Sequence, residues 1–259
     1  MKRKARFKKE QLRRGIYILP NIFTSLNFFC GFYSIVASIN GNFAAAAVAI
    51  LIAIVFDGMD GKIARVTNAT SKFGLEYDSL ADLVSFGLAP GLMVYLWALK
   101  PFGKIGWLAA FLFAICGALR LARFNTQAST ASSDYFTGLP IPAGAGMVSL
   151  TVLFYNRFAI TANTYPVLIL IMLYTIAFLM VSTFKYYSFK KPELFREMNF
   201  NVLVAAVLVL ILIAYEPAIF LFVLGVSYVV SGIYLTIRKS LKHKAAEPSE
   251  ADKQESRSI

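Results

Sequence analysis

The chain has 259 residues, of which 58% are hydrophobic, and a mean hydropathy of +0.64. Soluble domains contain about 45–50% apolar residues, so this composition excludes an ordinary soluble domain. The one histidine, His243, lies in a polar segment, which argues against a His-dependent triad and a His-ligated metal.

The first 14 residues carry eight of the lysines and arginines that give the net charge of +12. Such a segment attracts anionic lipid by about 1 kcal/mol per basic residue near the surface. Residues 1–16 are predicted to form either a short interfacial helix ahead of Pro20 or a disordered basic arm. A nucleic acid is not the expected partner, because the basic run leads directly into an apolar segment.

Eight apolar segments follow, and they lack the alternating polarity of membrane-spanning strands. We expect an all-α, polytopic membrane protein with about eight transmembrane helices. The expected spans are residues 18–38, 42–64, 76–98, 105–124, 141–160, 164–184, 200–214 and 217–237. The last two are separated by Glu216-Pro217, and a re-entrant hairpin is the alternative for them. Residues 239–259 are polar and are expected to be a disordered tail.

Basic residues predict the orientation of these spans. With the N-terminus in the cytoplasm, all but three of the 26 lysines and arginines lie on the cytoplasmic side, the exceptions being Lys100, Lys104 and Arg157. Positive charge favours the cytoplasmic side, so both termini are predicted to be there.

Four aspartates lie at the ends of the second and third predicted spans. Asp57 and Asp60 are three residues apart and Asp78 and Asp82 are four apart, so each pair shares one face of a helix. Charged side chains are costly near the bilayer, and a hard divalent cation with oxygen ligands compensates for them. The alternative is a set of interhelical salt bridges at the membrane surface.

Residues around the aspartates suit a phosphate ligand. Gly61 and Gly74 have no side chain to obstruct a bulky ligand, and Arg65 follows Gly61 by one helical turn. The aspartates are therefore predicted to lie beside a diphosphate.

This stretch resembles the signature of the CDP-alcohol phosphatidyltransferases. Every position of the motif is filled: Asp57-Gly-Met-Asp60-Gly61-Lys-Ile-Ala64-Arg65, then Gly74-x-x-x-Asp78-x-x-x-Asp82. Further segments are similar to those of the membrane-embedded phosphatidylserine synthases in that family, namely Pro20-Asn21-Ile-Phe-Thr24-x-x-Asn27, Tyr77-Asp78-Ser79-Leu80-Ala81-Asp82, Arg120-Leu-Ala-Arg123-Phe124-Asn125 and Gly138-Leu139-Pro140-Ile-Pro142-Ala143.

The resemblance implies a six-span core at residues 17–185, two additional spans at residues 186–238 and a homodimer in the cell inner membrane. It also implies CDP-diacylglycerol and L-serine as substrates, with Mn²⁺ or Mg²⁺, and two ions are expected. Glycerol phosphate, inositol phosphate or choline as the acceptor, or a cation transporter, remain alternatives.

The family motif assigns roles to individual residues. Asp57, Asp60, Asp78 and Asp82 are expected metal ligands, and Asp82 is also the expected general base or, alternatively, only a ligand. The CDP-diacylglycerol site is expected to include Gly61, Arg65, Ser71, Gly74, Asn21 and Thr24. For Asn21 and Thr24, helix capping or interhelical hydrogen bonding is the alternative.

The acceptor requires different partners. The serine carboxylate needs an arginine and its ammonium needs an acidic or carbonyl group. Arg120 and Arg123, three residues apart at the cytoplasmic end of the fourth span, are the candidates for the carboxylate, and anchoring at the membrane edge is the alternative. The segment Gly138 to Pro142 is predicted to form a rigid turn into the fifth span.

Overall fold

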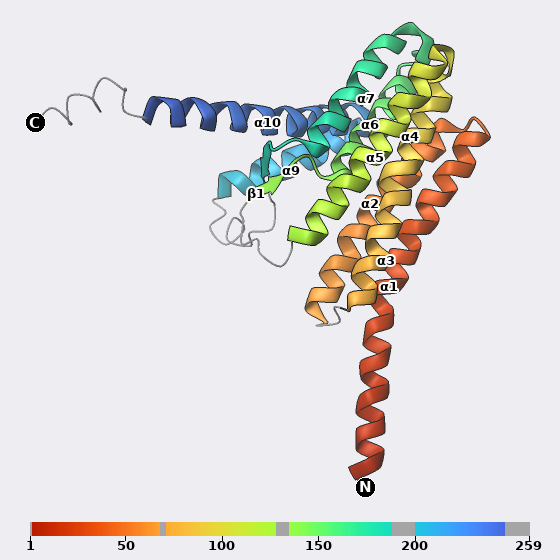
Figure 1. Cartoon of the computed structure of the whole chain (residues 1–259), viewed down its shortest axis with the longest axis vertical. Coiled ribbons are helices and arrows are strands. Elements are labelled where there is room, and N and C mark those ends of the chain that lie inside the picture. The colour runs from red at the N-terminus through yellow and green to blue at the C-terminus, as the bar shows by residue number, and fades with distance from the viewer. Residues whose placement is uncertain (1, 68–70, 128–134, 188–199, 247–259) are drawn as a thin grey trace, which may run out of the picture.

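The computed structural model describes residues 2–67, 71–127, 135–187 and 200–246, and these form a helical bundle (Figure 1). The main helices are α1 (Lys2–Ile39), α2 (Phe43–Val66), α3 (Lys72–Asp82), α4 (Ala89–Val94), α5 (Lys104–Gln127), α6 (Ile141–Arg157), α7 (Pro166–Val181), α9 (Phe200–Tyr215) and α10 (Pro217–Ala246). The shorter turns are η1 (Leu83–Leu88), η2 (Tyr95–Leu99), η3 (Lys100–Phe102) and η4 (Ala162–Thr164).

The described helices include five that are long and apolar enough to cross a membrane. They are Leu19–Ile39, Phe43–Val66, Lys72–Phe102, Lys104–Thr126 and Pro217–Thr236, and the shorter apolar helices are Pro166–Val181 and Val204–Tyr215. Each of the eight predicted spans contains a helix. The expected polytopic helical membrane protein is therefore confirmed.

The third span is one continuous helical rod with two π-helical stretches, η1 and η2. The first of these begins immediately after Asp82. Single π-helical turns often accompany functional sites, because they change the direction in which the following side chains point.

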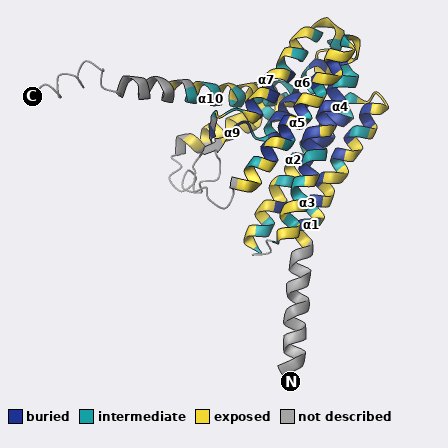
Figure 2. Cartoon of the chain, in the orientation of Figure 1, coloured by how far each residue is buried: buried dark blue, intermediate teal, exposed yellow. Residues whose placement is uncertain are grey.

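Close packing of small residues brings α1, α2 and the third span together. Gly31 of α1 lies so close to Ser85 of η1 that a Cβ atom there would be 2.6 Å from the Ser85 Cα. Buried residues gather in the middle of the bundle, and most residues of α4 and α6 are buried (Figure 2). The ends of α1, α2 and α3 are thereby held in fixed positions.

The structure contains two three-residue strands that the sequence did not predict, one before α6 and one after α7. Strand β1 (Tyr135–Thr137) pairs antiparallel with β2 (Lys185–Tyr187). Gly138 follows β1 with a φ of +79°, and its N–H donates to the Phe184 carbonyl at 2.8 Å. The predicted rigid turn before α6 is therefore present.

The last two helices differ from the rest. Most side chains of α9 are exposed, and α10 runs across the bundle, whereas α1, α2 and α5 run along it (Figure 1). Gly225 of α10 lies against Met147 of α6. Glu216, at the turn between α9 and α10, pairs with Arg157 at the end of α6. The Arg157 guanidinium holds the pKa of the Glu216 carboxyl below its usual value.

Both terminal segments were partly mispredicted. The backbone of α1 is helical from Lys2 and continues through Pro20, so residues 2–16 form neither a separate helix nor a disordered arm. Helix α10 continues to Ala246, so the expected disorder is wrong for residues 239–246. The rest of that tail, residues 247–259, lies outside the described residues.

Candidate active site

Three of the four predicted aspartates meet where α2 ends and α3 begins. Asp57 and Asp60 come from the last turns of α2 and Asp78 comes from α3. One carboxylate oxygen from each lies within 4.8 Å of the other two. Three carboxylates this close repel one another strongly in a poorly hydrated site unless a cation lies between them.

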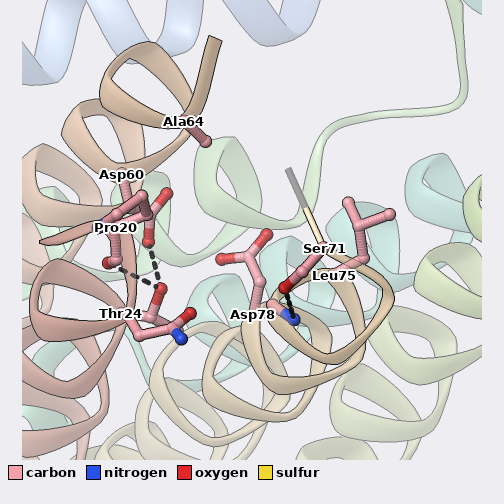
Figure 3. A pocket seen from close by; sticks show the side chains of 10 residues that line it. Pro20, Thr24, Asp60, Ala64, Ser71, Leu75 and Asp78 are labelled. Atoms are coloured by element: carbon pink, nitrogen blue, oxygen red, sulfur yellow. Dashed lines mark hydrogen bonds between the residues drawn. The ribbon is translucent and has the colours of Figure 1, made fainter. Parts of the chain in front are cut away.

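Thr24 of α1 holds one of these carboxylates in place. It is 3% exposed, and its hydroxyl donates to Asp60 Oδ2 at 2.9 Å and lies 3.3 Å from the Pro20 carbonyl (Figure 3). Interhelical hydrogen bonding, the alternative for Thr24, is therefore what the structure shows. The same residue also lines the pocket beside the aspartates.

That pocket contains most of the residues expected to bind the CDP-lipid. Its lining is Pro20, Asn21, Thr24, Asp60, Gly61, Ala64, Ser71, Gly74, Leu75 and Asp78. Asp60 and Asp78 point toward the same space in Figure 3. Two of the predicted metal ligands thus face the site predicted for a diphosphate.

The two motif glycines serve different purposes. A Cβ atom on Gly61 would meet nothing within 4 Å, so its backbone is open to a ligand. A Cβ on Gly74 would lie 3.1 Å from Ser71 Oγ and 3.4 Å from Asn21 Oδ1. Gly74 therefore allows close packing of the pocket wall, where Ser71 caps α3 by accepting from the Gly74 N–H at 2.9 Å.

Arg65 is the exception among the six residues predicted for the CDP-lipid. Its Nε donates to the Gly61 carbonyl at 2.9 Å, its side chain is exposed, and it is not part of the pocket lining. The guanidinium nevertheless lies one turn from Gly61, on the helix end that carries Asp57 and Asp60.

Asp82 is separate from the group of three aspartates. It is 7% exposed, and the Asn27 amide nitrogen donates to its Oδ1 at 2.9 Å. Asn27 is itself fully buried, and its backbone carbonyl accepts from the Ser85 hydroxyl at 2.9 Å. Asp82 is therefore held by α1, beside the cluster instead of within it.

The two candidate arginines are in different surroundings. Arg123 donates to the carbonyls of Val181 at 3.0 Å and of Met180 and Ser182 at 3.4 Å, which caps the end of α7. Arg120 is 8% exposed, and its Nε has no hydrogen-bond partner. The charge of Arg120 interacts with those of Asp82 and Asp57, whereas the guanidinium of Arg123 bonds to the end of α7.

The donor set fits a divalent cation. Asp78 Oδ1 is buried without a hydrogen-bond partner, and it belongs to a group of three carboxylates that can converge on one ion. Hard cations such as Mg²⁺ and Mn²⁺ prefer such oxygen ligands. The cluster can thus hold a divalent cation.

Sequence reasoning missed the roles of Asn27 and Ser85. Asn27 lies three residues after Thr24 and so on the same face of α1, and the motif alone indicates no role for it. That spacing was the available signal. The sequence contains no such signal for Ser85, because its hydroxyl bonds to the backbone of a distant residue, Asn27.

The chain is similar to known proteins. The family model for CDP-alcohol phosphatidyltransferase matches residues 17–181. A protein of Helicobacter pylori (strain ATCC 700392 / 26695) named CDP-diacylglycerol–serine O-phosphatidyltransferase is 38% identical over 218 residues, which are 84% of this chain and 90% of that protein.

Two further relatives are similar over shorter regions. A protein of Bacillus subtilis (strain 168) with the same name is 39% identical over 67% of this chain and 92% of its own length. An archaetidylserine synthase of Methanothermobacter thermautotrophicus is 42% identical over 51% of this chain and 56% of its own length. The family match includes α2 to α7 and every residue discussed above as a candidate site residue, and it spans more than half of the chain. The chain therefore belongs to the CDP-alcohol phosphatidyltransferase family.

Proposed function

We propose that this protein transfers the phosphatidyl group of CDP-diacylglycerol to L-serine, giving phosphatidylserine and CMP. The observation that carries the proposal is the convergence of Asp57, Asp60 and Asp78 beside the pocket. The names of two relatives, both CDP-diacylglycerol–serine O-phosphatidyltransferases, support serine as the acceptor.

Residues of the pocket would bind the CDP-lipid. The open backbone at Gly61 lets the diphosphate approach, and Asn21, Thr24, Ser71 and Gly74 form the facing wall. Arg65 would turn from the Gly61 carbonyl toward the diphosphate, because a guanidinium binds phosphate oxygens more strongly than a neutral carbonyl.

Asp57, Asp60 and Asp78 would hold the metal, with Asp82 shared with or beside a second ion. In our proposal the site holds two cations, either Mn²⁺ or Mg²⁺. When bound, they would stabilise charge on the diphosphate and make the serine hydroxyl more acidic. Thr24 would fix the orientation of Asp60 for this purpose.

Asp82 would act as the general base. It accepts the proton of the serine hydroxyl while the hydroxyl oxygen bonds to the phosphorus that carries the diacylglycerol. The bond between that phosphorus and the bridging oxygen breaks, and CMP leaves with this oxygen. Arg120, whose charge interacts with that of Asp82 and whose Nε has no hydrogen-bond partner, would hold the serine carboxylate.

The location of the site in the membrane is also a proposal. The distribution of lysines and arginines supports a cytoplasmic site with both termini on the same side, in the cell inner membrane. Serine and CMP are water-soluble, so the site must open to an aqueous compartment. The homodimer remains a prediction from the family resemblance.

A transfer assay on the purified protein tests the function. It would contain CDP-diacylglycerol, Mn²⁺ and one acceptor at a time, namely serine, glycerol 3-phosphate, inositol phosphate or choline, and CMP release would be measured. We expect release with serine only. Release with a different acceptor would contradict the assignment of serine, and release with none would contradict the transferase assignment.

A further inference from the structure

Buried polar atoms without partners concentrate around the proposed site. Among the described residues, five buried side-chain atoms have no hydrogen-bond partner: Asn27 Oδ1, Ser34 Oγ, Asp78 Oδ1, Arg120 Nε and Ser149 Oγ. A buried polar atom without a partner costs about 1–3 kcal/mol, so such atoms need an explanation. Three of the five belong to Asp78 or to residues that interact with Asp82.

The Asp78 oxygen is explained by a cation, but the other two are not. Asn27 offers a hydrogen-bond acceptor and Arg120 a donor, and both side chains interact with Asp82. Serine carries one ammonium, one carboxylate and one hydroxyl. An acceptor, a donor and a base in the same place match these three groups in kind.

We propose that Asn27 determines the specificity for the acceptor: its amide oxygen receives the ammonium of serine, while its amide nitrogen holds Asp82. This inference rests on the proposed function and deepens it. Arg120 takes the carboxylate and Asp82 faces the hydroxyl, as proposed above.

The covalent structure of serine fits this arrangement. The ammonium and the hydroxyl of serine are on neighbouring carbons, and Asn27 Oδ1 and Nδ2 are on the same carbon. Asn27 Nδ2 donates to Asp82 Oδ1 at 2.9 Å. An ammonium bound to Asn27 Oδ1 therefore keeps the serine hydroxyl near the Asp82 carboxylate. The Asn27 amide therefore fixes where the serine ammonium lies relative to Asp82, which faces the serine hydroxyl.

Burial of these groups supports the same role. Asn27, Asp82 and Arg120 are 0%, 7% and 8% exposed. A hydroxyl held among them is shielded from water, which would otherwise compete with serine for the activated phosphorus. The position of Asn27 is rigid, because Ser85 donates to its carbonyl and Gly31 lies directly against Ser85.

The experiment compares three acceptors in three variants of the full-length protein, with CMP release as the readout. Serine is compared with 3-hydroxypropionate, which lacks the ammonium, and with ethanolamine, which lacks the carboxylate. Asn27→Leu removes both hydrogen-bonding groups of the amide, and Asn27→Asp keeps an acceptor oxygen. Ser34→Ala is the matched control, since Ser34 is buried and unpartnered on α1, about 10 Å farther along the helix.

We expect Asn27→Leu to reduce the preference for serine over 3-hydroxypropionate, as a ratio of kcat/KM, by about tenfold or more. Its preference for serine over ethanolamine should be unchanged. Asn27→Asp should keep the preference for the ammonium but lose kcat, because its carboxylate no longer donates to Asp82. Ser34→Ala should resemble the wild type in both ratios.

An unchanged ratio of serine to 3-hydroxypropionate in Asn27→Leu would overturn the inference while leaving the proposed function intact. If Asn27→Leu does not fold, Asn27→Asp decides, because loss of its preference for the ammonium contradicts the inference and retention supports it. A wild type that uses glycerol 3-phosphate but not serine would overturn the proposed function, and this inference with it.

Discussion

The aspartates of the site are held by different neighbours, and this supports the different roles proposed for them. Asp60 accepts from Thr24 and Asp82 accepts from Asn27, whereas Asp78 keeps a buried oxygen without a partner. A carboxylate with a free buried oxygen is suited to a cation, and a carboxylate held away from the other three is suited to proton transfer.

The Thr24 hydroxyl orients a proposed metal ligand, so its removal should weaken metal binding. We expect Thr24→Val to raise the Mn²⁺ concentration for half-maximal CMP release by about tenfold or more, with a smaller effect on the maximal rate. Thr151→Val is the control, because Thr151 is also buried but bonds to Met147 in α6. Equal Mn²⁺ requirements in both variants would remove Thr24 from the metal site.

Asp82 should be required for turnover and not for binding of the CDP-lipid. General-base catalysis contributes typically 10²–10⁴-fold, so Asp82→Asn should lower kcat by about 100-fold or more. Binding of CDP-diacylglycerol, measured by calorimetry, should stay near the wild-type value. Glu76→Gln is the control, because Glu76 is exposed on the same helix. A fully active Asp82→Asn would leave Asp82 without a catalytic role.

At the scale of elements, the site depends on connections that the helices make outside it. Gly138, between β1 and α6, lies where Arg123 of α5 reaches the carbonyls at the end of α7. A Cβ on Gly138 would collide with the Met180 carbonyl and lie 2.9 Å from an Arg123 nitrogen. This junction holds the end of α5, which also carries Arg120.

The junction predicts a difference between two glycines. Gly138 and Gly41 have φ values of +79° and +77°, but a Cβ on Gly41 would meet nothing within 4 Å. Gly41→Ala should therefore cost only the backbone strain, about 1 kcal/mol, and Gly138→Ala should cost about 1–3 kcal/mol more. Thermal unfolding in detergent measures both, and equal losses would contradict the close packing at Gly138.

Substitutions of the two arginines of α5 should have different effects. Arg120→Ala should raise the KM for serine by about tenfold or more, because the carboxylate loses its partner. Arg123→Ala should instead lower the melting temperature and leave that KM near the wild-type value, because Arg123 caps α7. A raised KM in Arg123→Ala alone would reverse the assignment.

Some of these elements were predictable and others were not. Apolar run length predicted the helices, and the spacing of Asp57 and Asp60 predicted that they share one helix face, because helical periodicity is a local property. The separation of Asp82 from the other three aspartates was not predicted, because it depends on a hydrogen bond from Asn27 in a distant part of the chain. The capping role of Arg123 was not predictable, since it depends on carbonyls about 58 residues away along the chain. Strands β1 and β2 were missed because each has only three residues, which is too short for a recognisable pattern.

At the scale of the whole molecule, the bundle places polar chemistry at one end of an apolar protein. Helix α1 leads away from that end and α2 returns to it, so Thr24, Asn27 and the aspartates come together (Figure 1). The continuation of α10 to Ala246 was missed because the polar composition of this segment was interpreted as disorder, although lysine and alanine favour a helix. The boundary of the six-span core at residue 185 stays a prediction.

The central claim is that the aspartate cluster is a metal centre for transfer to serine. The most direct test follows labelled serine into phosphatidylserine with the purified protein, after EDTA and again after added Mn²⁺. We predict that EDTA abolishes incorporation, that Mn²⁺ restores it with one CMP released per lipid formed, and that Asp57→Asn and Asp78→Asn remain inactive with Mn²⁺. Incorporation that continues in EDTA, or wild-type incorporation by both variants, would contradict the claim.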